Sequence, residues 1–159
     1  MFAHRILFVG ITFAALAGCA AHRVPVTVAE TIAASAQLST LSKLVARTNL
    51  AETLTTSGPF TVFAPSNEAF AKLPAQTLSD LAADPIKLNA MLAYHVLPVK
   101  LMAADAKNST AKTLTGASVA IAKAGDFVTI EDAVVQKADI PASNGVVHIV
   151  DSVLLPPAR

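Results

Sequence analysis

The sequence predicts an α+β domain with a largely antiparallel sheet. Between residues 27 and 93, apolar residues recur mostly at helical spacing, with one β-prone interruption. From residue 101 onward, short β-prone runs follow one another and are separated by turn residues. Because the helices come first and the strands later, joined by short turns, an α+β arrangement is favoured over an alternating parallel one.

The helical part is expected to begin at Thr27, which together with Glu30 has the spacing of a capping box. The apolar positions that then recur at helical spacing are Leu38, Leu41, Leu44 and Val45, and Leu50 and Leu54 extend the pattern into a third short helix. The breaker sequence Ser57-Gly58-Pro59 ends this series.

A single strand is expected at 60–64, where β-prone residues are stopped by Pro65. Either Ser66 or Asn67 can cap the helix that follows. A further helix is expected at 76–81, and another from Asp84-Pro85 to about residue 93, since a capping carboxylate followed by proline favours a helix start.

The second half of the sequence predicts strands that are separated by turns. The expected strands are 101–104, 118–122, 127–130, 134–138, 146–150 and 153–155. Residues 124–126 and 143–145 have turn composition, and 108–110 are interpreted as a polar loop. No internal repeat or linker interrupts the pattern, so we expect one domain.

The N-terminal residues have the organisation of a secretory leader. Arg5 precedes an apolar run from 6 to 17, which is too short to span a bilayer as a helix of about 20 residues. The run ends in Leu16-Ala17-Gly18-Cys19, which resembles a bacterial lipobox, and Cys19 is the only cysteine. The sequence therefore predicts a lipoprotein signal peptide at 1–18, a tether at 19–26 lipidated on Cys19, and a domain at 27–157.

Composition argues against binding of nucleic acid by this domain. Without residues 1–18 the chain has 11 basic and 11 acidic residues, because Arg5 leaves with the leader. There is no long basic run to neutralise phosphates. Tryptophan is absent, and the phenylalanines are expected mostly in the core rather than on the surface as stacking platforms.

Two histidines lie within apolar runs, and neither has the neighbours that catalysis or metal binding needs. His95 and His148 are expected to be buried and hydrogen-bonded. Along a strand, His148 and Asp151 would face opposite sides, which does not suit a Ser-His-Asp triad. No Gly-x-Ser-x-Gly or His-Glu-x-x-His motif is present, so no cofactor, metal or catalytic residue is expected. Asp151 is expected to accept hydrogen bonds from backbone N–H groups.

Three segments in order resemble the signature blocks of the fasciclin-like domain family. They are residues 58–70, containing Thr61, Phe63, Pro65 and Asn67; the dipeptide Tyr94-His95; and residues 144–156, containing His148 and Asp151. The resemblance implies a wedge of two mainly antiparallel β-sheets with helices packed on one side. It also implies adhesion without shared catalytic chemistry, and it marks Asp139, Ile140, Tyr94 and His95 as candidate partner-binding residues.

Together these observations predict a non-enzymatic, lipid-anchored interaction module of the bacterial cell envelope. We expect a monomer that contacts a membrane through its N-terminal lipid and binds an envelope or matrix protein or polysaccharide. Ala20 after Cys19 favours the outer membrane. Two alternatives remain: a small periplasmic hydrolase that uses His95 or His148, and a structural envelope protein without a dedicated ligand.

Overall fold

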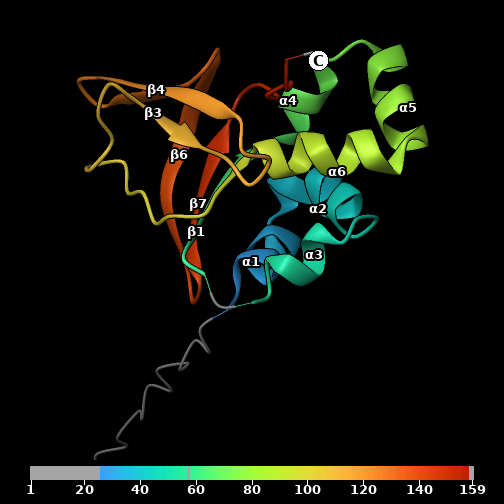
Figure 1. Ribbon diagram of the computed structural model, residues 1–159, viewed down its shortest axis with the longest axis horizontal. Helices are drawn as coiled ribbons and strands as arrows, with labels where there is room; N and C mark the ends of the chain where they lie inside the picture. Colours follow the sequence, from blue (N-terminus) through green and yellow to red (C-terminus); the bar gives the residue numbers. More distant parts are fainter. Residues whose placement is uncertain (1–25, 57, 158–159) are drawn as a thin grey trace, which may run out of the picture.

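A computed structural model describes residues 26–56 and 58–157, in which helices cover one side of a curved sheet (Figure 1). The helices are α1 (Val28–Ala34), a short 3-10 helix (Ala36–Leu38), α2 (Ser39–Val45), α3 (Leu50–Thr53), α4 (Asn67–Ala71), α5 (Ala75–Ala83) and α6 (Pro85–Tyr94). The strands are β1 (Phe60–Pro65), β2 (Val96–Leu97), β3 (Ser109–Lys112), β4 (Ser118–Ala124), β5 (Phe127–Ile130), β6 (Ala133–Ala142) and β7 (Gly145–Val150). The predicted α+β class is confirmed.

Side-chain caps begin three of the helices where the sequence predicts a start. Thr27 and Glu30 form the complete capping box of α1. Ser66, rather than Asn67, caps α4, because its Oγ accepts a hydrogen bond from the N–H of Ala69 at 3.2 Å. Asp84 caps α6 by accepting from two backbone N–H groups, with proline as the next residue.

Asn67 has a different structural task, which is to join α4 to the start of α2. Its Oδ1 accepts a hydrogen bond from the N–H of Thr40 at 3.0 Å, and its amide nitrogen donates to the carbonyl of Ala36 at 2.9 Å. These bonds hold two helices that are about 30 residues apart in sequence, and they place α4 beside the first helices.

The strands pair in the order β2-β1-β7-β6-β5-β4-β3. β1 and β7 run parallel, with Phe60 opposite Gly145 and Pro65 opposite Val150, and every other pair is antiparallel. The long strand β6 pairs with β7 through an irregular register and with β5 through its first residues. β6 therefore links a β2-β1-β7-β6 section to a β6-β5-β4-β3 section, which corresponds to the two sheets of the expected wedge.

The central strands separate two hydrophobic clusters, because their side chains alternate between faces. Val62 of β1 and Val147 of β7 belong to a cluster beneath the helices, together with Leu88 of α6. Phe63 of β1 and Val150 of β7 belong to a cluster that is closed by β4 and β5. Both faces of β1 and β7 are therefore buried, as the unbroken apolar composition of each strand requires.

Three expectations about the second half are wrong. Residues 101–104 and 153–155 are not strands, because N–H groups at Leu101, Ala103 and Leu154 donate to side chains elsewhere in the fold instead of joining a ladder. The expected polar loop at 108–110 includes the first residues of β3, which pairs with β4 despite its exposed, polar composition. The phenylalanines lie mostly in the core, as expected, because Phe60, Phe63 and Phe70 are buried, while Phe127 is 69% exposed at the β4–β5 hairpin.

The signal peptide, the lipidation of Cys19 and the tether up to residue 25 lie outside the described residues. Within 26–56 and 58–157, none of the helices has the length and apolar character needed to cross a bilayer.

Candidate functional site

His95 lies at the C-terminal end of α6 and is almost completely buried, with 1% exposure. Its Nδ1 is 2.7 Å from the carbonyl oxygen of Met91, and its Nε2 accepts a hydrogen bond from the N–H of Leu154 at 2.9 Å. Since a carbonyl can only accept, Nδ1 carries the proton and the ring is the neutral Nδ1–H tautomer. His95 thus ties the segment after β7 to the end of α6.

His148 lies in the middle of β7 and is 3% exposed. Its Nε2 is 2.7 Å from the carbonyl oxygen of Leu101, so Nε2 donates, while Nδ1 accepts from the N–H of Asp139 at 3.1 Å. One face of the ring stacks on Phe63, with 5.5 Å between the ring centroids. His148 therefore joins the loop after β2 to an irregular part of β6.

Burial places both imidazoles in their neutral form at neutral pH. Desolvation lowers the pKa of His95 to about 4, although the carbonyl of Met91 opposes the shift. Desolvation also lowers the pKa of His148, while the carbonyl of Leu101 and the charge of Asp139 oppose it. A neutral ring with both nitrogens bonded to the backbone has no free lone pair to act as a base, so the observed geometry is that of a structural group.

The low pKa of His95 predicts that the protein loses stability in mild acid. An unfolded chain, whose histidine has a pKa near 6.5, takes up the proton first as the pH falls. The unfolding free energy should therefore fall between pH 6.5 and pH 4, by about 3 kcal/mol from His95. Urea unfolding at pH 7.5 and pH 4.5 measures the loss, and His95→Gln should show a shallower decline. If the unfolding free energy of His95→Gln fell by the same amount, the loss of stability in acid would not come from His95.

The four candidate partner-binding residues do not form one exposed surface. Tyr94 and His95 are buried, with 5% and 1% exposure, and burial raises the pKa of the Tyr94 hydroxyl. Asp139 is partly exposed, but its Oδ1 accepts a hydrogen bond from the N–H of Ala103 at 2.8 Å. Ile140 packs against the helix-side cluster. Direct contact with a partner is therefore open only to Asp139 and, to a lesser degree, Ile140.

Thr61 of β1 is fully buried and uses its hydroxyl to hold the loop after β2. Its Oγ1 donates to the carbonyl of Val99 at 2.6 Å and accepts from the N–H of Leu101 at 2.8 Å. The loop is thus attached both to Thr61 and, through the carbonyl of Leu101, to His148.

Asp151, directly after β7, accepts a hydrogen bond from the backbone N–H of Val134 at 2.8 Å, as expected. This bond, followed by contacts with Lys72 and Ser152, holds the pKa of the carboxyl below its usual value. The Lys72 ammonium lies 3.2 Å from Oδ2 in a largely exposed ion pair. Asp151 therefore closes the end of the sheet rather than pairing with His148.

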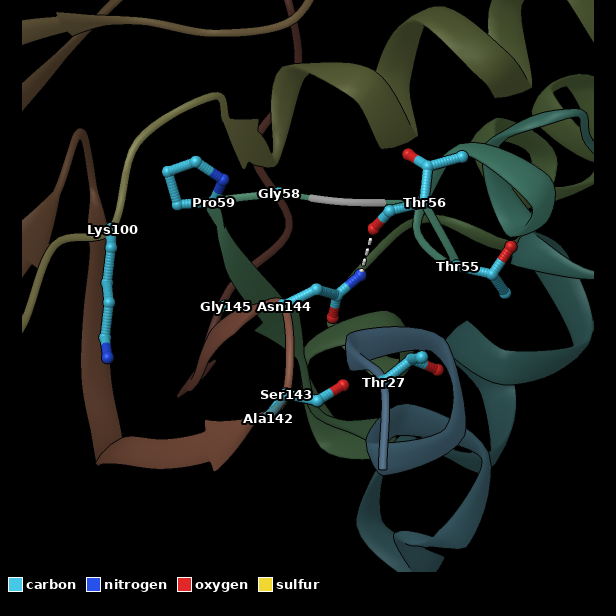
Figure 2. A pocket seen from close by; sticks show the side chains of 10 residues that line it. All are labelled: Thr27, Thr55, Thr56, Gly58, Pro59, Lys100, Ala142, Ser143, Asn144 and Gly145. Carbon is cyan, nitrogen blue, oxygen red and sulfur yellow. Dashed lines mark hydrogen bonds between the residues drawn. The ribbon is translucent and has the colours of Figure 1, made fainter. Parts of the chain in front are cut away.

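Polar side chains gather in an open pocket of about 540 Å³, where the turn before β7 meets the segment before β1 (Figure 2). The residues that line it include Thr27, Thr55, Thr56, Ser143 and Lys100. We call this the polar pocket. Thr55 and Thr56 each donate to a nearby carbonyl at 2.6 Å, so their oxygens keep lone pairs that can accept from a ligand.

Asn144 organises the polar pocket from its centre. Its Oδ1 accepts from the N–H of Val28 at 2.8 Å, and its amide nitrogen donates to the carbonyls of Leu54 and Thr56 at 2.8 and 2.7 Å. Figure 2 shows this side chain between the Thr55–Thr56 segment and the start of α1. Asn144 thus connects β7, α1 and the end of α3, and it sets the positions of the surrounding hydroxyls.

Sequence reasoning missed Asn144, Lys100 and the threonines as possible site residues. Asn144-Gly145 was expected as a turn at the start of a signature block and Thr27 as a helix cap, while Thr55 and Thr56 belong to an ordinary polar segment. The one available signal is that two turn-forming sequences, 57–59 and 143–145, each precede a buried strand. Among the described residues, no group of three His, Cys, Asp or Glu side chains could hold a metal ion.

Comparison with known proteins identifies the family. The fasciclin domain model matches residues 36–156. The chain is 41% identical over 133 residues to protein sll1483 of Synechocystis, covering 82% of this chain and 74% of that one, and 41% identical over 110 residues to immunogenic protein MPT70 of Mycobacterium tuberculosis, covering 69% and 56%. It is 35% identical over 127 residues to human periostin, covering 79% of this chain and 15% of periostin.

The fold agrees with a solved structure from this family. A FAS1 domain pair from the insect cell adhesion molecule fasciclin I superposes with a TM-score of 0.65 at 18% identity, covering 82% of this chain and 51% of that one. The family model, the relatives and the shared fold lead to the same result: the chain belongs to the fasciclin domain family.

Proposed function

We propose that the protein is a non-enzymatic, lipid-anchored interaction module that presents the polar pocket to a partner in the cell envelope or matrix. The observation that carries the proposal is a contrast between two sets of polar groups. His95 and His148 are buried and bonded to the backbone, whereas Thr55, Thr56, Ser143 and Lys100, which line the polar pocket, are exposed. Membership of a family that includes a cell adhesion molecule supports the same function.

The chemistry of the polar pocket favours a protein partner over a polysaccharide. Its lining offers hydroxyls, backbone groups around Gly58 and Gly145 and, within 26–56 and 58–157, one cation, Lys100. Among the residues that the structure describes, no aromatic side chain lines it, whereas sugar-binding surfaces commonly stack rings on aromatic faces. A protein segment with exposed N–H groups and a carboxylate would match the free lone pairs of Thr55 and Thr56 and the ammonium of Lys100.

Capture from cells tests whether the polar pocket is the binding surface. The full chain, tagged at its C-terminus, would be cross-linked in the producing cells, purified and compared with Lys100→Glu and Ser143→Phe. Both residues are exposed and line the polar pocket, so we expect each variant to lose the captured partner at least tenfold while melting normally. Lys137→Glu makes the same charge change at an exposed position of β6 outside the polar pocket, and it should retain the partner.

Two results would contradict this proposal. One is a partner that both pocket variants retain as well as the unsubstituted chain does. The other is turnover of a model ester that disappears in His95→Gln or His148→Gln, which would favour the hydrolase alternative instead.

The membrane anchor is a separate part of the proposal and rests on the sequence Leu16-Ala17-Gly18-Cys19. Acylation of Cys19 with two or more chains would hold the protein firmly, since each buried CH₂ contributes about 0.8 kcal/mol. Cys19→Ala is therefore expected to move the protein from the membrane fraction to the soluble fraction, as followed by fractionation and immunoblotting. A variant that stays with the membranes would show that the anchor is another feature.

A further inference from the structure

A second concavity, separate from the polar pocket, lies between α5, α6 and the segment after β7. It has a volume of about 750 Å³, and its apolar wall is formed by Leu81, Ala90, Met91, Ala117, Leu155 and Pro156. We call it the apolar crevice. It shares no residue with the polar pocket. Figure 1 shows α5 meeting the N-terminal end of α6 at an angle in the helical layer. Leu81 of α5 and Ala90 of α6 both line the crevice.

The apolar crevice has side chains that the fold leaves partly uncovered. α5 has no buried residue, although Leu78 and Leu81 face the helix-side cluster. Leu155, on the opposite wall, is 49% exposed. The volume lies within the range of about 300–1,000 Å³ that is typical of small-molecule sites, and a concave wall encloses a slender ligand better than it fits a flat protein surface. An alkyl chain would cover these side chains.

The charge at the apolar crevice favours an anionic head group. Lys87 is the one charged residue in its wall, and the wall contains no carboxylate among the described residues. The ammonium of Lys87 lies 3.6 Å from Oδ2 of Asp84 in an exposed ion pair, which is a weak contact. Asp84 also caps α6 through Oδ1, so its position does not depend on Lys87. Lys87 can therefore turn to a ligand carboxylate at little cost.

From these observations we propose that the apolar crevice binds a single-chain amphiphile with a carboxylate head, of the fatty-acid class. The alkyl chain lies between α6 and the segment after β7, and the carboxylate pairs with Lys87. This inference is independent of the proposed function of the polar pocket.

Calorimetric titration tests the proposal directly. The full chain carrying Cys19→Ala, which has no lipid of its own to compete, would be titrated without detergent with decanoate, dodecanoate and tetradecanoate below their micelle concentrations. We expect one saturable site whose affinity rises about three- to fourfold per added CH₂. Dodecyltrimethylammonium, which has the same chain length as dodecanoate but a positive head, should bind at least tenfold more weakly.

Matched variants locate the site. Ala90→Phe on α6 and Ala117→Leu between β3 and β4 fill the crevice from two directions, and each should weaken dodecanoate at least tenfold. Ile86→Phe adds an aromatic ring to α6 at a position that is 82% exposed and outside the crevice, so it should bind normally. Lys87→Gln should abolish the preference for the carboxylate while keeping the dependence on chain length, and Lys43→Gln, on α2, should change neither.

The proposal is overturned if the carboxylates show no saturable binding, or if both crevice-filling variants melt normally and still bind dodecanoate like the unsubstituted chain. It is also overturned if light scattering shows self-association that Ala90→Phe abolishes, because the crevice would then be an interface between two copies.

Discussion

His95→Ala is expected to lower the melting temperature by about 10 °C at pH 7.5, corresponding to a loss of about 3–5 kcal/mol in unfolding free energy. Because His95 is 1% exposed, removing its ring leaves a cavity inside the fold. It also leaves two buried backbone groups without their partners, the carbonyl of Met91 and the N–H of Leu154. Circular dichroism during heating measures the change.

An exposed position provides the control for this substitution. Gln136→Ala, on β6, changes a side chain at the surface and should alter the melting temperature by no more than about 2 °C. If His95→Ala melted normally but lost a captured partner, His95 would be a functional residue and its structural assignment would be wrong.

Gly145→Ala is expected to destabilise the fold by about 3 kcal/mol or more. A Cβ at this position would lie 2.1 Å from the carbonyl oxygen of Phe60 and 2.9 Å from its carbonyl carbon. Both atoms belong to the backbone of β1, which pairs with β7 at this point, so neither can rotate away. Relief of the clash requires the parallel pair β1–β7 to separate.

Gly125→Ala is the matched comparison, because it makes the same change at a glycine with open space around it. Gly125 lies in the β4–β5 turn with a φ of +61°, and no atom lies within 4 Å of an added Cβ. Only the left-handed backbone conformation opposes alanine there, at a cost of about 1 kcal/mol. Urea unfolding of both variants should rank Gly145→Ala as clearly the more damaging, and equal losses would contradict the proposed clash.

The sequence predicted best those elements whose cause is local. The capping box at Thr27, the cap and proline at Asp84-Pro85 and the turn at Gly125 each depend on neighbouring residues, and each lies where expected. The failures have a distant cause. The N–H groups of Leu101 and Leu154 donate to side chains that are 40 and 59 residues away, so β-prone composition did not produce strands there.

The buried histidines and the polar pocket also differed in how far the sequence could predict them, and for the same reason. Burial of His95 and His148 could be predicted because apolar residues surround each histidine in the sequence itself. The polar pocket could not be predicted, because it combines residues near 27, 55, 100 and 143. Each of these segments alone has the composition of an ordinary turn or helix end. Only the hydrogen bonds of Asn144 show that they meet.

The structural role of the two histidines is tested most directly by an NMR titration of their ring nitrogens and carbons. The geometry predicts opposite neutral tautomers, Nδ1–H for His95 and Nε2–H for His148. It also predicts that His95 stays neutral down to about pH 4 and that the pKa of His148 lies below its ordinary value. The account would be contradicted if the two rings shared a tautomer, titrated near pH 6.5 and exchanged their N–H protons with solvent.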